Sequence, residues 1–316
     1  MLWLIGNRGM LGTELSKLLE QENIPYAGTD REVDITDPAA LEVFARNVWP
    51  GKGSARWIVN CAAYTAVDRA EDEQELCRQL NTQGAANIAA CAAGAGAGLI
   101  HISTDYVFDG EGIPGGDGKP RPYREDDRTN PAGVYGLTKR DGETVVMENN
   151  PASIIIRTAW LYGQYGSNFV ATMLALMKKR DSVSVVNDQY GSPTWARDLA
   201  GVLLEIVKTA ENGRQIPCGI YHYTNEGSIT WYDFAEKIHE EARSAGLLAK
   251  HCTVKPCASA EYPARVKRPA YSVLDKTKIR KVLGLRIPSW DDSLRNHLTA
   301  IRQARIVSQG DSVAHT

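Results

Sequence analysis

Short apolar runs alternate with amphipathic segments along the first half of the chain. Residues 1–5 form a continuous apolar run that ends at a glycine, which is typical of a strand buried on both faces of a parallel sheet. Leucines at positions 11, 15, 18 and 19 follow at helical spacing. The same alternation predicts further strands at 24–28, 57–61, 99–102 and 153–157, with helices starting at Asp37-Pro38 and spanning 71–93 and 135–147. The pattern predicts an α/β fold with a doubly wound parallel sheet.

The alternation of apolar runs and amphipathic segments changes after about residue 160. The pattern there predicts helices at 169–179, 198–208 and 231–245, strands at 182–187 and 221–224, a loop-rich stretch over 255–273 and a frayed tail at 308–316. We predict a Rossmann-type nucleotide-binding domain over residues 1–160, with later strand and helix contributions from about 181–225. Residues 161–316 are expected to form mainly a smaller C-terminal substrate-binding lobe.

Composition narrows the possible classes of protein. The 316 residues carry 36 Lys and Arg against 38 Asp and Glu, a net charge of −2 with neutral histidines. Such a balance gives no reason to expect a nucleic-acid partner or a polybasic membrane surface. The apolar start lacks the basic region of a signal peptide, and no apolar run approaches the length of a membrane span. We therefore expect a cytoplasmic protein with no membrane partner, whose six cysteines are reduced.

Three glycines follow the first predicted strand at a spacing of three. Gly6, Gly9 and Gly12 lie between that strand and the first helix, where a tight turn lets the backbone approach a diphosphate. The helix N-terminus then offers free N–H groups to the phosphates. A second run with the same spacing, at 112–118, lies among prolines and is expected to be a loop. The first run predicts a dinucleotide site that also includes Arg8, Met10 and Leu11.

The end of the second predicted strand carries charges of both signs. Asp30 can bind the adenosine ribose hydroxyls of NAD, whereas Arg31, helped by Arg8, can bind the 2′-phosphate of NADP. Either NADH or NADPH is therefore expected, without strong preference. Asp34 and Ile35 are candidate contacts of the adenine.

Tyr135 and Lys139 are four residues apart, on one face of a predicted helix. A phenol with a pKa near 10 is a poor acid at neutral pH unless a nearby cation favours its anion. Thr104 directly follows the fourth predicted strand, at the sheet edge where reactive groups gather in such folds. Its hydroxyl could bind the same substrate oxygen as Tyr135. The hypothesis from the residues is a catalytic group of Thr104, Tyr135 and Lys139.

These motifs, in this order, resemble the extended short-chain dehydrogenase/reductase family, and more narrowly its dTDP-4-dehydrorhamnose reductases. The supporting stretches are NCAAYTAVD at 60–68, STDYVF at 103–108, RTAWLYG at 157–163, DQYGSPT at 188–194 and RPAYSVL at 268–274. The resemblance implies reduction of the 4-keto group of dTDP-4-dehydro-L-rhamnose to dTDP-L-rhamnose. Hydride would come from NADPH or NADH, Tyr135 would donate the proton, and Lys139 would lower the pKa of Tyr135 while holding the nicotinamide ribose.

The resemblance also implies further contacts. Ala62, Ala63 and Tyr64 would lie under the cofactor. The substrate pocket would be formed by Thr65, Val67, Thr104, Tyr106 and Trp160. Arg268 would bind the substrate diphosphate, although Arg265 and Lys267 are further cations nearby.

Two alternatives and one departure stay open at this point. The chain could be a sugar-nucleotide 4,6-dehydratase or epimerase, but the dehydratases follow the catalytic threonine with Asp-Glu, and here Asp105-Tyr106 follows. It could also be a non-catalytic subunit like the regulatory subunit of methionine adenosyltransferase. Some relatives bind Mg²⁺ at a dimer contact, where Glu14 could be one ligand, but Arg197 stands where another carboxylate is expected. We therefore expect no metal, and either a monomer or a homodimer.

Overall fold

A computed structural model describes residues 1–50, 56–116, 118–261 and 264–313 of the chain. Within these residues six parallel strands form one central sheet, in the order β12-β7-β4-β3-β1-β2. Their bounds are β1 (Leu2–Ile5), β2 (Tyr26–Thr29), β3 (Trp57–Asn60), β4 (Gly98–Thr104), β7 (Ile154–Thr158) and β12 (Gly219–His222). The order of the strands reverses at β1, so the prediction of a doubly wound Rossmann-type sheet is confirmed.

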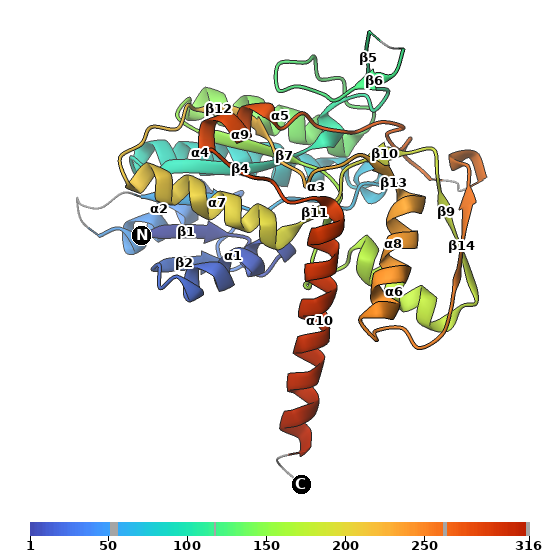
Figure 1. Ribbon diagram of the computed structural model, residues 1–316. Helices are drawn as coiled ribbons and strands as arrows, with labels where there is room; N and C mark the ends of the chain where they lie inside the picture. Colours follow the sequence, from blue (N-terminus) through green and yellow to red (C-terminus); the bar gives the residue numbers. More distant parts are fainter. Residues whose placement is uncertain (51–55, 117, 262–263, 314–316) are drawn as a thin grey trace.

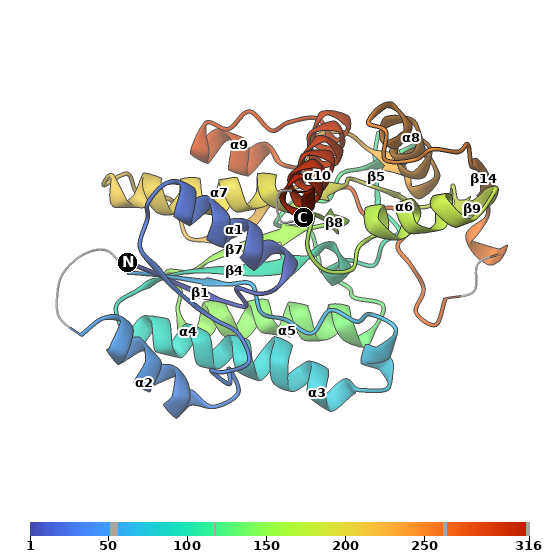
Figure 2. The ribbon, with the colours of Figure 1, turned by 90° about the horizontal axis from the view of Figure 1, so that it is seen from below.

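Helices cover both faces of the sheet, which gives three layers (Figure 2). One face carries α1 (Met10–Gln21), α7 (Ala196–Glu211) and α9 (Thr277–Leu283), and the other carries α2 (Pro38–Val48), α3 (Gln74–Arg78), α4 (Gly84–Gly94) and α5 (Val134–Asn149). Side chains of β1 alternate between the two hydrophobic cores, since Leu4 packs with the α1 and α7 side and Trp3 with the α2 and α4 side. Burial on both faces explains the continuous apolar run of this strand.

The first half follows the predicted strands and helices with two differences. The run 112–118, expected to be a loop, contains the short strand β5 (Ile113–Pro114), which pairs with β6 (Pro120–Arg121). Asp37 caps α2 as predicted, its side chain accepting from the backbone N–H groups of Ala39 and Ala40. The helix predicted over 71–93 is instead composed of η1 (Arg69–Glu71), α3, a π-helical turn η2 (Gln79–Gln83) and α4. Within η2 the side chain of Asn81 binds both the N–H and the C=O of Tyr64, at 2.8 and 3.1 Å. Single π turns of this kind often occur beside functional sites.

The C-terminal half builds a separate hydrophobic cluster beside the sheet (Figure 1). It lies among α6 (Phe169–Lys179), α8 (Trp231–Ser244), α10 (Trp290–Val313) and the parallel pair β9 (Ser182–Val186) and β14 (Thr253–Cys257). The remaining short elements of the described residues are η3 (Asp105–Val107), β5 (Ile113–Pro114), β6 (Pro120–Arg121), β8 (Leu161–Tyr162), β10 (Tyr190–Gly191), β11 (Thr194–Trp195), β13 (Ile229–Thr230) and η4 (Ser259–Glu261). The proposed division into a nucleotide-binding domain and a substrate lobe stays a prediction.

One expectation for this half holds for most of its length, and one was wrong. The stretch 255–273 was predicted to be loop-rich, and most of its described residues lie outside strands and helices. Its start belongs to β14, where Pro256 is tolerated because the strand pairs with β9 on one side only. Residues 262–263 of that stretch lie outside the described residues. The tail was expected to fray from residue 308, but α10 continues to Val313, and 314–316 lie outside the described part.

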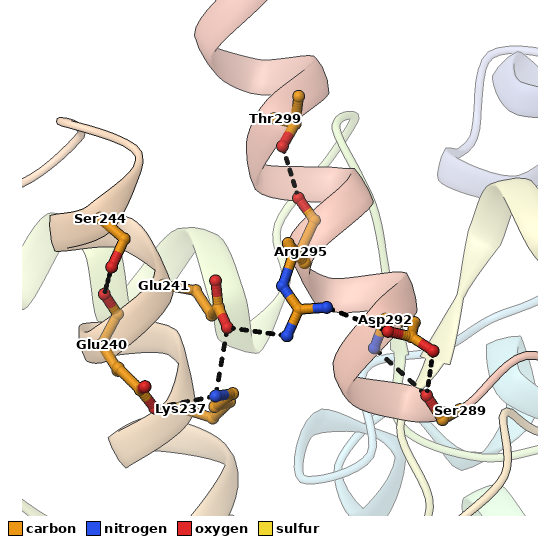
Figure 3. Close-up of polar contacts among 8 residues, drawn as sticks. All are labelled: Lys237, Glu240, Glu241, Ser244, Ser289, Asp292, Arg295 and Thr299. Atoms are coloured by element: carbon orange, nitrogen blue, oxygen red, sulfur yellow. Dashed lines mark hydrogen bonds and ion pairs between the residues drawn. The ribbon is translucent and has the colours of Figure 1, made fainter.

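Ion pairs attach the start of α10 to α8 (Figure 3). The guanidinium of Arg295 lies 3.2 Å from Glu241 of α8 and 3.0 Å from Asp292 one turn earlier. Lys237 also pairs with Glu241, at 3.1 Å. The far end of α10 extends away from the rest of the fold in Figure 1.

Two further expectations concern the thiols and membranes. The six cysteines are free thiols, and Cys77, Cys91 and Cys252 are buried. None of the helices within the described ranges is both long and apolar enough to cross a bilayer.

Candidate active site

A cavity of about 460 Å³ lies at the carboxyl ends of the central strands. It brings together many of the residues predicted from the sequence: Gly9, Met10, Leu11, Gly12, Ala63, Thr65, Val67, Thr104, Tyr106, Tyr135, Lys139 and Trp160. Residues that the sequence reasoning did not select also line it: Cys61, Ile102, Ser103, Asp105, Thr158, Ala159, Leu161 and Ser167. Most of these unpredicted residues flank strand ends, so their position depends on which strands become neighbours.

The glycine turn has the geometry that a dinucleotide site requires. Gly6 has a φ of +77°, and a side chain there would place its Cβ 2.8 Å from the backbone nitrogen of Ala62. A Cβ on Gly12 would lie 2.1 Å from the carbonyl oxygen of Gly6. Both positions therefore demand glycine.

The first turn of α1 faces the cavity without a cap. Gly9 is the N-cap, and no side chain among the described residues caps this end of the helix. Gly9, Met10, Leu11 and Gly12 all line the cavity. Free N–H groups and the positive end of the helix dipole suit the diphosphate of a dinucleotide, so the residues present fit this group.

The charged residues after β2 make contacts that were not predicted from the sequence. Arg8 lies 3.6 Å from Glu32, an ion pair that the sequence reasoning missed, while Arg31 is exposed and Asp30 is partly buried. The side chain of Glu32 also accepts the backbone N–H of Asp30 at 3.1 Å. Arg8, the predicted helper of Arg31 in binding a 2′-phosphate, is thus already paired with a carboxylate.

Asp34 and Ile35 lie in the loop that follows. Asp34 closes a local turn by accepting from the N–H and hydroxyl of Thr36, both at 2.8 Å. Ile35 is buried in the core on the α2 and α4 side of the sheet. Their role as adenine contacts stays a prediction.

Thr104 and Tyr135 meet in the cavity from two different elements. Thr104 ends β4, and its hydroxyl donates to the carboxylate of Asp105 at 3.0 Å. Tyr135 is in the first turn of α5; burial raises its pKa above the ordinary tyrosine value, and a hydrogen bond with Thr104 lowers the pKa in part. Gly136 allows this approach, because a Cβ there would lie 2.2 Å from the carbonyl oxygen of Tyr106.

Lys139 lies one turn further along α5 and is buried. Its Nζ donates to the carbonyl oxygen of Ile102 at 2.6 Å and lies 3.5 Å from Nε2 of His101. Burial lowers the pKa of Lys139 to about 8. The amine is therefore held at the cavity wall by β4 and has a weakened affinity for its proton.

Asp105 lines the cavity, although no role was predicted for it from the sequence. It is 3% exposed, and burial raises its pKa to about 6, although the hydroxyls of Ser272 and Thr104 offset part of this effect. The sequence offered one signal for it, its position directly after Thr104.

Ala62 and Tyr64 are not among the residues that line the cavity, whereas Trp160 lines it. Ala62 packs against the glycine turn, and the hydroxyl of Tyr64 donates to Glu73 at 2.6 Å. Trp160 has a φ of +48° and stacks on Trp231 with ring centroids 3.5 Å apart. A left-handed backbone at a bulky residue is costly and tends to occur at functional sites.

Arg268 lies close to Tyr106, and its Nη2 donates to Asp68. Its Nη1 is buried and has no hydrogen-bond partner among the described residues. Arg265 and Lys267 instead form exposed pairs with Asp72 and Glu111. Of these three cations, Arg268 is the one beside Tyr106, which lines the cavity.

Glu14, considered as a metal ligand, is buried beside a cation. Nη1 of Arg197 lies 3.6 Å from its carboxylate, while burial raises the pKa of Glu14. No group of three potential metal-binding side chains occurs among the described residues.

Comparison with known proteins shows the family to which the chain belongs. The family model for the RmlD substrate binding domain matches residues 1–303. The chain belongs to this RmlD family. A dTDP-4-dehydrorhamnose reductase of Aggregatibacter actinomycetemcomitans is 39% identical over 301 residues, which cover 93% of this chain and 97% of that protein. The chain is thus a member of a family of oxidoreductases.

Solved structures of RmlD family relatives have the same fold. A dTDP-4-dehydrorhamnose reductase of Clostridium acetobutylicum matches with a TM-score of 0.83 and 38% identity, covering 95% of this chain and 99% of that one. The enzyme of Bacillus anthracis, solved in complex with NADP, matches with a TM-score of 0.83 and 36% identity, covering 94% and 97%.

Proposed function

We propose that the protein reduces the 4-keto group of dTDP-4-dehydro-L-rhamnose to dTDP-L-rhamnose, with NADPH or NADH as the electron donor. The observation that carries the proposal is that Thr104, Tyr135 and Lys139 line one cavity together with the first turn of α1. The identity to reductase relatives over most of both chains supports the reductase over a dehydratase. The NADP complex of the Bacillus anthracis relative supports the choice of cofactor.

The cofactor, when bound, supplies a hydride to the carbonyl carbon. The N–H groups of the first turn of α1 would hold its diphosphate, and the Lys139 amine would hold its nicotinamide ribose. Asp30, Arg31, Arg8, Asp34 and Ile35 would bind its adenosine end, and Ala62, Ala63 and Tyr64 would contact the rest of the cofactor.

The side chains of the cavity donate the proton and bind the substrate. Tyr135 donates its phenolic proton to the oxygen that gains charge as the carbonyl is reduced. The Thr104 hydroxyl turns from Asp105 to donate to the same oxygen, which stabilises the charge. The Lys139 cation favours the tyrosinate left behind. Thr65, Val67, Tyr106 and Trp160 enclose the sugar, and Arg268 binds the diphosphate.

The test is the consumption of NADPH with dTDP-4-dehydro-L-rhamnose by wild-type protein and by Tyr135→Phe. Loss of a general acid is expected to lower kcat by about 10²- to 10⁴-fold. Tyr232→Phe is the matched control, because that phenol lies on α8 and bonds to Glu236. An unchanged rate in Tyr135→Phe would remove the proton donor. A dehydratase or epimerase recycles its NAD⁺, so a wild type without net NADPH consumption would overturn the reductase.

A further inference from the structure

Three buried side chains from three elements form a line that ends at Lys139. Asn60 ends β3, His101 lies in β4, and the two are register partners in the sheet. Nδ2 of Asn60 is 3.0 Å from Nδ1 of His101, and Nε2 of His101 is 3.5 Å from Nζ of Lys139. All three residues are at most 2% exposed.

The orientation of the Asn60 amide is fixed by the backbone. The N–H of Ala62 donates to Oδ1 of Asn60 at 3.0 Å. A flipped amide would direct its NH₂ group at that N–H, which would leave two donors facing each other. Nδ2 of Asn60 therefore faces His101 as a donor, and Nδ1 of His101 is the acceptor.

The ring of His101 is neutral, so it carries one proton. Complete burial and the nearby Lys139 amine hold the pKa of His101 well below its ordinary value. Because Nδ1 accepts from Asn60, the single proton lies on Nε2, the atom that faces Lys139. A donor directed at an amine is compatible with NH₂, which has a lone pair, and opposes NH₃⁺, which has none.

We propose that His101 is a positioning residue that Asn60 holds as the Nε2–H tautomer, and that this N–H weakens the hold of Lys139 on its proton. The inference rests on the proposed function, in which Lys139 acts as a cation. It follows that the tautomer of His101 sets the pH above which the reductase loses activity.

Other groups around Lys139 act in the opposite direction and raise its pKa. On α5 itself Glu143 favours the ammonium, as do the thiols of Cys77 on α3 and Cys61 after β3. Tyr135 lies one turn before Lys139 on the same helix. Among the described residues that face the amine, His101 is the one that directs an N–H at it.

The chain contains an internal control for the tautomer. His222 is also buried and neutral, its pKa lowered to about 3 by burial and by Arg157. Its Nε2 faces Nη1 of Arg157 at 3.4 Å, and its Nδ1 faces the carbonyl oxygen of Tyr123 at 3.2 Å. A guanidinium only donates and a carbonyl only accepts, so His222 is the Nδ1–H tautomer.

The first experiment is nitrogen NMR of the full-length protein labelled on histidine, with His101→Phe and His222→Phe used for assignment. The ring nitrogen shifts should show Nε2–H at His101 and Nδ1–H at His222 at neutral pH. An Nδ1–H or a doubly protonated ring at His101 overturns the proposal. This outcome does not depend on turnover, so it is separate from failure of the proposed reaction.

The second experiment is the pH profile of kcat in Asn60→Asp. The carboxylate accepts from both Ala62 and Nδ1–H of His101, so the ring presents its Nε2 lone pair to Lys139. The alkaline limb should move upward by about one pH unit, a tenfold change in proton affinity. An unmoved limb, with kcat or stability alone reduced, means a merely structural role and overturns the proposal.

The charge added by Asn60→Asp could itself raise the pKa of Lys139. The double variant Asn60→Asp/His101→Phe separates the two causes. If the tautomer is responsible, Asn60→Asp moves the limb in the wild-type background and leaves it in place in the His101→Phe background. A shift of equal size in both backgrounds overturns the proposal.

Discussion

Arg157 and Glu143 form a buried ion pair that joins β7 to α5 beneath the candidate active site. Nε and Nη2 of Arg157 lie 2.8 and 2.7 Å from the two carboxylate oxygens, and the hydroxyl of Ser103 donates to Glu143 at 2.5 Å. Both side chains are at most 5% exposed. Since Glu143 is one turn after Lys139, the pair fixes the face of α5 that carries Tyr135 and Lys139.

Removing one partner of this pair should destabilise the protein strongly. Arg157→Met leaves the Glu143 carboxylate buried without its cation, which is expected to lower the free energy of unfolding by about 3–5 kcal/mol. Chemical denaturation measures the effect. The double variant Arg157→Met/Glu143→Leu removes both charges and should recover most of the loss; a double variant as unstable as the single one would contradict this account.

Arg268→Ala should weaken binding of the sugar nucleotide selectively. The guanidinium has one buried nitrogen without a partner and lies beside Tyr106, so it is poised to bind an anion. Loss of charged hydrogen bonds is expected to raise KM for the sugar nucleotide by about 10- to 100-fold, with much less effect on KM for NADPH. Arg265→Ala is the matched control, because that arginine pairs with Asp72 at the surface. Equal effects of Arg268→Ala on both KM values would count against the role.

Glu32→Gln should shift cofactor preference toward NADPH. The change releases Arg8 from its ion pair, so the guanidinium can meet a 2′-phosphate. Both groups are exposed, and the expected change in the ratio of kcat/KM for NADPH and NADH is about two- to fivefold. Arg8→Gln is the control and should shift the ratio the other way. A ratio that Glu32→Gln leaves unchanged would show that Arg8 does not reach the cofactor.

Asp105→Asn should change how stability depends on pH. Burial raises the pKa of Asp105 from 3.8 to about 6 in the folded state, so the folded protein binds this proton more tightly than the unfolded chain does. The wild type therefore gains stability from this proton below pH 3.8 and loses it as the pH rises through about 6.

The size of this effect follows from the two pKa values. The variant should become more stable relative to wild type across that window, by roughly 3 kcal/mol at most. Denaturation curves at a series of pH values give the difference. A difference that does not depend on pH would show that Asp105 is not protonated in this range.

Much of the fold was predictable because its signals are local. The apolar run at the first strand, the N-cap at Asp37 and the four-residue spacing of Tyr135 and Lys139 each depend on neighbours within a few residues. The π-helical turn η2, by contrast, contains Asn81, whose side chain bonds to Tyr64, a residue 17 positions earlier. The pairing of β14 with β9 likewise joins segments about 70 residues apart.

The sequence by itself determined the order of the main strands and helices of the first half, the glycine turn and the identity of the residues expected to do the chemistry. Only the tertiary structure decided which groups surround them: the Asn60 amide behind His101, the Arg157 guanidinium beneath Glu143 and the Glu32 carboxylate on Arg8. The physical reason is the distance along the chain over which each kind of interaction acts. Backbone propensity and helical spacing act over a few residues, whereas hydrogen bonds and ion pairs in a dry interior depend on which distant strands and helices come to lie side by side.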